Sequence, residues 1–462
     1  MVLQYRMEET EFWMQRIGWE MLYSNKDLKK LILPLVFEQF LAILVGMVDT
    51  VMISSVGEAA VSGVSLVDNI NILVINITAA MATGGAVVAG HFLGQKESGN
   101  AGRAAWQLIL FSTMAATVIF VCLTVFHRPL LGTIFGNVEE EVMSSAVTYL
   151  LITAISIVPL AVYNACAALF RAMNNSKTTM LISVLMNTIN IAGNGILIYG
   201  IDMGVAGAAI PTAVSRTVAA VIIFVLMCNE DRAIHIKGRM TWRIDGGLIK
   251  RILYIGVPNG VENSLFQLGK ILLLSLISTF GTYAMAANAV CNTLAGFNIL
   301  PGQAIGLALV SVVAVCVGAG DYKQARYYTR KLMLVTQISI AGLSAVLLIF
   351  SPYILKIYHL NPETELLAIQ VIRYHAALAL MIWAPSFTLP NTLRASGDVV
   401  WTMFVAIGSM WVFRIGAAYV FHRFFGLGLI GVWIAMTIDW AFRGLCYCLR
   451  YYGNKWEKAL QS

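Results

Sequence analysis

The sequence predicts an all-α membrane protein: twelve transmembrane helices in two six-helix lobes, related by a pseudo-twofold axis along the membrane normal. Of the 462 residues, 59% are hydrophobic and only 12% are charged, whereas soluble domains average about 25% charged residues. The apolar runs are about 20 residues long, as spanning helices require, and about twice the length of barrel strands. Lipid tolerates only structures that pair all their backbone groups, so these runs are expected to be helices.

The predicted spans are apolar runs bounded by charged or turn residues. In chain order they cover residues 30–54, 63–93, 104–126, 143–170, 178–200, 205–228, 250–279, 285–317, 330–351, 365–393, 399–422 and 428–449. The longest polar connection lies at the midpoint of the chain and is interpreted as a linker. The resulting domains are an N-terminal segment (1–28), an N-lobe (29–228), the linker (229–249), a C-lobe (250–450) and a C-terminal tail (451–462).

Positive charge is distributed unevenly among the loops. Of the 31 Lys and Arg residues, 24 lie in the N-terminal segment, the loops on its side of the membrane and the C-terminal tail. Four fall within the spans, and three lie in the opposite loops: Arg128, Lys356 and Arg423. Because cytoplasmic loops carry the excess of Lys and Arg, both termini are expected in the cytoplasm, in a multi-pass protein of the cell (inner) membrane. This distribution explains the net charge of +7 without a nucleic-acid partner.

The two halves of the chain fall into register when the sequence is shifted by 224 residues. The pairs include Pro34/Pro258, Glu38/Glu262, Gly57/Gly281, Gly94/Gly318, Gly204/Gly428 and Gly207/Gly431, and a shift of 223 pairs Arg171 with Arg394. Each half holds six helices and therefore ends on the side where it began. Two such copies must be related by an axis along the membrane normal.

A duplicated bundle of this kind favours a transporter that works by alternating access. The alternative is a duplication that is only architectural, as in some channels. Long pores usually display charge rings or filter sequences, and none is found in the sequence. The sequence also has no Walker A motif, no HExxH and no zinc-ligand spacing. Secondary-active transport is therefore expected, rather than ATP-driven transport or an enzymatic activity.

Four segments resemble signatures of the multidrug and toxic compound extrusion (MATE) transporters, which belong to a larger group that also contains lipid-oligosaccharide flippases. They are residues 33–63 (with the VDT and G-EAA elements), 306–331 (GLALVSVVAVCVGAGDYKQARYYTRK), 168–178 (ALFRAMNNSKT) and 392–398 (TLRASGD). The resemblance covers roughly residues 28–450. It implies a coupled exchange of organic compounds for protons or sodium ions.

Ionisable residues inside spans are candidate functional groups because their burial is costly. Glu38 and Asp49 are 11 residues apart in the first span, which places them on one helix face about 16 Å apart. The resemblance implies that Asp49 binds the coupling ion, since burial disfavours a charged carboxylate and hydration favours it again. The alternative is a water-exposed Asp at the helix end.

Further polar residues of the N-lobe match the same family site. Asn190 and Asn194 follow Asn187 on one helix face, and the resemblance adds Thr212 and Tyr149 to their network. The family pattern has Asn followed four residues later by Asp, so Asn194 replaces a carboxylate and cannot carry a proton. Ordinary polar helix packing is the alternative for all of these side chains.

The C-lobe carries a different set of charges. Glu262 and Lys270 lie in the seventh span, and Arg414 stands opposite Asn190 in the repeat. Asp439 and Arg443 are spaced i, i+4 and are expected to form an ion pair. These residues, with Glu38, form a candidate site for the substrate or a second ion. The alternative is that the charges only neutralise one another.

The sequence thus favours a multidrug efflux antiporter for organic, cationic or amphiphilic compounds. Its expected partners are a small-molecule substrate, a coupling cation (H+ or Na+) and membrane lipid, with no cofactor, no metal site and no second subunit. A lipid-linked oligosaccharide flippase is the first alternative; it predicts a larger and strongly basic central cavity. A receptor or scaffold is the second; it predicts a sizeable soluble domain, and the longest polar tail has only about 25 residues.

Overall fold

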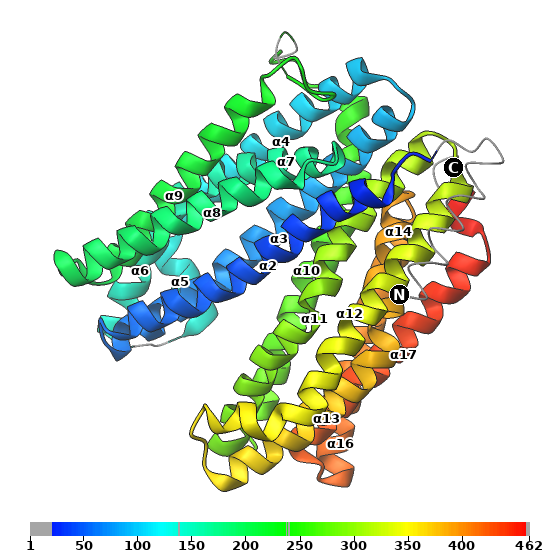
Figure 1. Cartoon of the computed structure of the whole chain (residues 1–462). Helices are drawn as coiled ribbons and strands as arrows, with labels where there is room; N and C mark the ends of the chain where they lie inside the picture. Colours follow the sequence, from blue (N-terminus) through cyan, green and yellow to red (C-terminus); the bar gives the residue numbers. More distant parts are fainter. Residues whose placement is uncertain (1–20, 137–138, 237, 239–240, 459–462) are drawn as a thin grey trace.

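The computed structural model describes residues 21–136, 139–236, 238 and 241–458, and these are mostly long helices (Figure 1). The N-lobe contains α2 (Asn25–Ser54), α3 (Glu58–Gly94), α4 (Ser98–Val125), α5 (His127–Phe135), α6 (Glu140–Ile155), α7 (Ile157–Ala172), α8 (Ser176–Asn194), η1 (Gly195–Gly200) and α9 (Gly204–Met227). The C-lobe contains α10 (Gly246–Ser278), α11 (Thr282–Gly318), α12 (Tyr322–Lys356), α13 (Pro362–Trp383), η2 (Ala384–Thr388), α14 (Leu389–Ala395), α15 (Val399–Ser409), η3 (Met410–Gly416), α16 (Ala417–Phe425), α17 (Gly428–Tyr452) and the short η4 (Lys455–Lys458).

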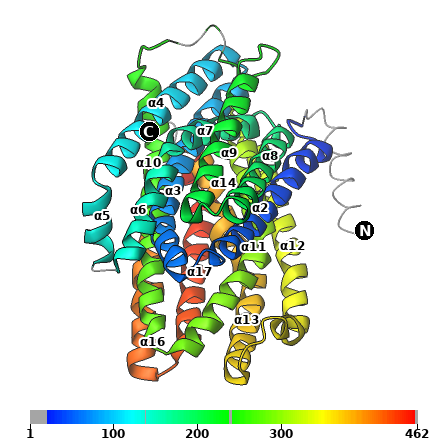
Figure 2. The ribbon, with the colours of Figure 1, turned by 90° about the vertical axis from the view of Figure 1, so that its left-hand side faces the viewer.

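Each predicted span corresponds to one long helix or to a run of joined helices. Among the described residues, eleven helices are long and apolar enough to cross a membrane, and α6 with α7 forms a twelfth span that bends by 47° at Ser156. The sequence did not predict α5, nor the π-helical turns η1, η2 and η3, which interrupt three spans. The long helices run in roughly one direction, as helices crossing one bilayer should (Figure 2).

The duplication is visible in the turns that join the helices. Residues with positive φ recur at the repeat distance: Gly57/Gly281, Lys96/Gly320, Asn174/Gly397, Asp202/Gly426 and Gly204/Gly428. Left-handed backbone is costly for most residues and is favoured by Gly, Asn and Asp. Both halves therefore turn at equivalent positions, even where the residue type differs.

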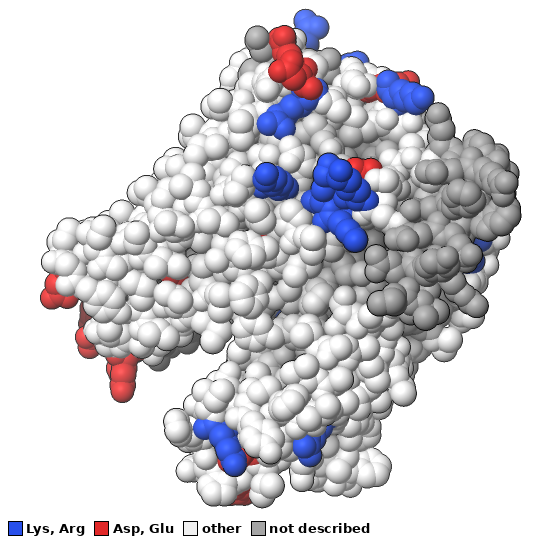
Figure 3. All heavy atoms as spheres, in the orientation of Figure 1, with Lys and Arg blue, Asp and Glu red and all other residues white. Residues whose placement is uncertain are grey.

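The two lobes form a V whose arms join at one end and splay apart at the other (Figures 1 and 3). One large cluster of buried apolar residues runs across both lobes, from Leu31 in α2 through Val313 in α11 to Tyr447 in α17. Two further clusters each belong to a single lobe, around Val67 in the N-lobe and around Ile372 in the C-lobe. Continuous packing thus joins the lobes only at the end that we call the closed end; the other is the open end.

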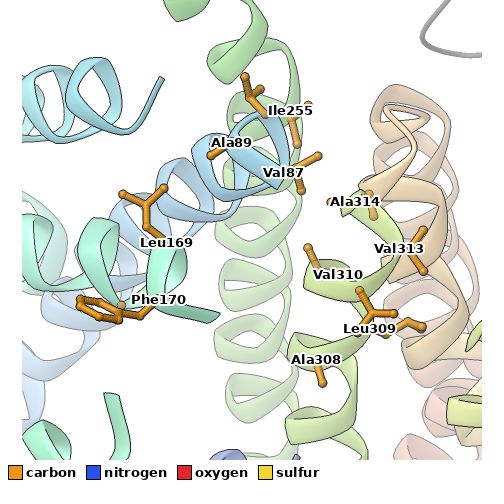
Figure 4. Packing of buried hydrophobic residues seen from close by; sticks show 14 of the residues in the cluster. Val87, Ala89, Leu169, Phe170, Ile255, Ala308, Leu309, Val310, Val313 and Ala314 are labelled. Carbon is orange, nitrogen blue, oxygen red and sulfur yellow. The ribbon is translucent and has the colours of Figure 1, made fainter. Parts of the chain in front are cut away.

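The closed end is sealed by glycines that bring α3 and α11 into backbone contact. A Cβ atom added to Gly94 would lie 2.1 Å from the Val315 carbonyl oxygen, and one added to Gly318 would lie 2.2 Å from that of His91. Residues 91 and 94 plus 224 are residues 315 and 318, so this contact is symmetric about the pseudo-twofold axis. The neighbouring apolar side chains are shown in Figure 4.

Candidate functional site

A small cavity lies within the N-lobe, between α2, α3, α6, α8 and α9. Its volume is about 250 Å³. Its polar lining includes Asp49, Asp68, Tyr149, Asn190 and Arg216. It is therefore much smaller than the roughly 300–1,000 Å³ typical of sites for organic ligands.

Asp49 is held in this cavity by amides from α8. The Asn194 Nδ2 donates to Asp49 Oδ1 at 2.8 Å. The Asn190 amide, oriented so that its nitrogen faces the carboxylate, donates to Oδ1 at 3.0 Å, and its oxygen lies 3.0 Å from the Thr212 hydroxyl. The structure thus brings together the four residues Asp49, Asn190, Asn194 and Thr212, and the buried Tyr149 lines the same cavity. Spacing of four residues on α8 explains why both amides reach one carboxylate.

Two charged residues of the cavity were not identified as site residues from the sequence. Asp68 projects from α3, and Arg216 projects from α9 and donates to the Ser156 hydroxyl at 3.0 Å, at the bend between α6 and α7. Both lie inside predicted apolar spans, and that position was the signal that could have identified them. The cavity therefore holds two carboxylates against one guanidinium, an excess of negative charge.

Oxygen atoms from carboxylates, amides and hydroxyls are the ligands that sodium and other hard cations prefer. A carboxylate in the same position can instead accept a proton. The N-lobe cavity therefore has the size and the donor set for a small cation, and it is too small for an organic compound of drug size.

A larger cavity lies in the cleft, mostly against the C-lobe. Its volume is about 870 Å³, and it reaches Gln39 and Asn76 of the N-lobe. Lys270 of α10 and Arg414 of η3 line it, together with amides and the rings of Phe266, Trp383, Phe387, Trp433 and Trp440. This cavity combines positive charge with aromatic surface.

Behind this cavity, the charged residues pair differently from the sequence expectation. Arg394 Nη2 lies 2.6 Å from Glu262 Oε1, and Arg443 Nη2 lies 3.6 Å from the same oxygen. Asp439, which is fully buried, faces Arg414 at 3.8 Å. The expected ion pair between Asp439 and Arg443 was wrong, because the packing of α17 turns Arg443 toward α10. Glu262 and Asp439 are thus engaged with guanidinium groups and do not line the cavity.

Glu38 lies apart from both cavities. Its carboxylate accepts a hydrogen bond from the Thr179 hydroxyl at 3.2 Å, and the Arg171 guanidinium supplies a nearby positive charge. The repeat equivalents of Glu38 and Arg171 are Glu262 and Arg394, so each lobe keeps one such charge pair at the same place. This placement separates Glu38 from Lys270 and Arg414, with which the sequence had grouped it.

The family described as MatE matches this chain twice, over residues 34–196 and 258–420. The two matches begin and end 224 residues apart, which is the repeat distance. The chain belongs to the MATE family. It is similar to a probable multidrug resistance protein NorM of Thermotoga maritima, with 27% identity over 94% of this chain and 93% of the relative. It is also similar to the uncharacterized transporter YisQ of Bacillus subtilis, with 26% identity over 92% of this chain and 93% of the relative.

Solved MATE structures share the fold of this MATE chain. One, described as the outward-facing conformation of a multidrug resistance MATE family transporter of the MOP superfamily, matches with a TM-score of 0.85 at 20% identity, over 94% of this chain and 96% of that one. Another, a MOP superfamily transporter from Pyrococcus furiosus whose description states that a reversed polarity of the binding pocket suggests a different function, matches with a TM-score of 0.86 at 19% identity, over 95% and 96%. At these identities the likeness establishes the fold, and the chain is a multi-pass membrane transporter of this family.

Proposed function

We propose that this MATE chain is a secondary-active antiporter that exports organic amphiphilic compounds in exchange for protons or sodium ions. The observation that carries the proposal is the Asp49 network, because a carboxylate held by two amides in a cavity of about 250 Å³ suits a small cation and little else. The multidrug resistance names of several relatives support export of organic compounds. Both cavities lie within one chain, so a monomer suffices.

The orientation proposed for the chain has its open end outside the cell. Lys and Arg gather over the closed end, around the start of α2 and near the connection after α9 (Figure 3). The described chain also begins and ends there, since Tyr23 and Glu457 both contact the first turns of α12. By the positive-inside rule this end faces the cytoplasm, so the structure corresponds to the state that releases substrate outward. Cation binding at Asp49 would then favour the return to the inward-open state.

Transport by purified protein in proteoliposomes tests this proposal. A fluorescent amphiphilic dye should exchange against separately imposed proton and sodium gradients, and one of the two gradients should drive it. Asp49→Asn should reduce gradient-driven exchange by at least tenfold, because an amide cannot take up the proton or neutralise the sodium ion. Asp202→Asn is the matched control, since Asp202 lies in an exposed turn of the same lobe. Undiminished exchange by the Asp49 variant would contradict the proposal.

The flippase alternative rests on one specific observation, which is that Lys270 and Arg414 line the larger cavity. Two cations could hold a pyrophosphate group. This alternative predicts that the same vesicles translocate a lipid-linked pyrophosphate and exchange no dye under either gradient.

A further inference from the structure

The lining of the larger cavity is basic and contains no carboxylate among the residues that the structure describes. Its charged groups are Lys270 and Arg414, one from each of two neighbouring C-lobe elements. At about 870 Å³ it has the volume of a typical site for an organic ligand. An organic cation would therefore meet two positive charges here and no negative one.

These two cations are only weakly neutralised. Lys270 has no hydrogen bond or ion pair within the described part of the chain; its Nζ lies 5.3 Å from the centre of the Phe266 ring. Arg414 lies 5.2 Å from the same ring, and its Asp439 contact at 3.8 Å is too long for a hydrogen bond.

The wider network does not supply the missing negative charge. In and behind the cavity, four cations face two carboxylates: Lys270, Arg394, Arg414 and Arg443 against Glu262 and Asp439. The region carries an excess of two positive charges in a setting where apolar walls strengthen electrostatic attraction.

Buried donors of the cavity residues also lack acceptors. Among the described residues, Arg414 Nε and Trp440 Nε1 have no hydrogen-bond partner, and neither ring nitrogen of His375 has one. Trp433 and Trp440 stand edge-on to His375, each with its ring centre 5.4 Å away. Unsatisfied buried donors are costly unless a ligand or water supplies acceptor atoms. The cavity therefore offers donors for oxygen atoms beside rings for an aromatic body.

We propose that this cavity binds amphiphilic aromatic anions, with a carboxylate or sulfonate between Lys270 and Arg414 and the aromatic body against the tryptophan wall. The proposal rests on the antiport function above and names its substrate class. Of the cationic or amphiphilic compounds expected from the sequence, it selects amphiphiles that carry negative charge.

One consequence concerns coupling between the two cavities. An anionic substrate and the coupling cation occupy separate cavities of opposite charge, so they do not compete for the same carboxylates. Exchange must then operate through the movement of the lobes, and excess cation should change the rate of transport without acting as a competitive inhibitor of substrate binding.

Binding of two dyes with one ring system tests the substrate class. The full chain in lipid nanodiscs is titrated with fluorescein, an anionic xanthene dye, and with rhodamine 123, a cationic one. Fluorescein should bind more tightly. Lys270→Gln should weaken fluorescein about tenfold, as expected for the loss of one charge-assisted contact, and should leave rhodamine 123 unchanged or tighter. Lys270→Arg should retain fluorescein affinity.

The control variant is Lys356→Gln, at the exposed outer end of α12, which should bind both dyes like the unchanged chain. Tighter binding of rhodamine 123 than of fluorescein, absence of binding by both dyes, or an unaltered fluorescein affinity in Lys270→Gln would each overturn the proposal. Competition by inorganic pyrophosphate but not by benzoate would also overturn it and would favour the flippase.

Failure of the substrate proposal can be told apart from failure of antiport. If fluorescein binds through Lys270 but no ion gradient drives its exchange in proteoliposomes, the anion site stands and the antiport proposal fails. If rhodamine 123 exchanges in an Asp49-dependent manner and fluorescein does not bind, antiport stands and the anion site fails.

Discussion

Asp49 and its repeat counterpart Leu273 illustrate how single residues set the lobes apart. The same comparison places Asn190 against Arg414 and Gly46 against Lys270. Each of these differences adds negative or hydrogen-bonding capacity to the N-lobe, or positive charge to the C-lobe. Because buried charge must be matched by a partner or a ligand, the two lobes are suited to ligands of opposite sign.

Asp68 provides a test of the N-lobe cavity at the scale of one residue. Asp68→Asn should raise the half-saturating concentration of the coupling cation about tenfold, equivalent to ~1.4 kcal/mol. The physical reason is that Arg216 would then be balanced by Asp49 alone, which leaves less negative charge for the cation. The measurement is dye exchange in proteoliposomes over a series of sodium concentrations or pH values. Asp202→Asn should behave like the unchanged chain, and an unshifted midpoint for Asp68→Asn would exclude Asp68 from the cation site.

At the scale of elements, each lobe is fastened to the other by the segment that precedes its first helix. Ahead of α2, the Tyr23 backbone exchanges two hydrogen bonds with the Tyr328 hydroxyl of α12, at 2.9 and 2.7 Å. Ahead of α10, Gln107 of α4 donates to the Arg243 carbonyl oxygen at 2.8 Å and accepts from the Asp245 amide at 3.1 Å. The helices α4 and α12 are repeat equivalents, so two matching straps cross the closed end in opposite directions.

Gln107→Leu tests the strap ahead of α10. Gln107 is 5% exposed, and its replacement removes both hydrogen bonds and leaves the Arg243 carbonyl oxygen and the Asp245 amide without them. We expect a loss of stability of about 2 kcal/mol, seen as a lower unfolding temperature of the purified protein in nanodiscs. Gln95→Leu, at an exposed position of the neighbouring turn, should change the temperature little. Equal unfolding temperatures for the two variants would show that the strap does not stabilise the closed end.

At the scale of the whole molecule, the V shape follows from where apolar packing is continuous. The lobes share one buried cluster at the closed end, while each has its own cluster toward the open end. Each lobe can therefore move as a unit, and the contact of Gly94 and Gly318 with the opposite backbone is the part that must separate. Alternating access requires an energy difference of only a few kcal/mol between such states.

Gly318→Val tests this contact. The added side chain would clash with the His91 carbonyl oxygen, so the closed end should be destabilised by about 1–3 kcal/mol and the lobes should pivot toward closure at the open end. Spin labels at Glu58 and Thr282, repeat equivalents at the starts of α3 and α11, should report a shorter mean distance in a cysteine-free variant. Gly342→Val, with no atoms within 4 Å of the added Cβ, is the control. An identical distance distribution for Gly318→Val and the unchanged chain would contradict this role.

The sequence by itself determined the number of spans, the duplication and the family. Apolar length and turn chemistry are local properties, so the predicted runs match the helices closely and Gly57 and Gly281 mark equivalent turns. The signatures and the VDT element also pointed to Asp49, Asn190, Asn194 and Thr212, which the structure brings together. The bend at Ser156 and the π-helical turns were not predicted, because they depend on contacts with other helices.

Only the tertiary structure decided which charges meet and how large the cavities are. The i, i+4 spacing of Asp439 and Arg443 describes neighbours on one helix, but packing against α10 and η3 gives Arg443 to Glu262 and Arg414 to Asp439. The convergence of Asp68 and Arg216 on Asp49, from three different helices, likewise has no local signal. Helix periodicity orients a side chain around its own axis, whereas the partner of a buried charge is set by the rotation and tilt of every helix in the bundle.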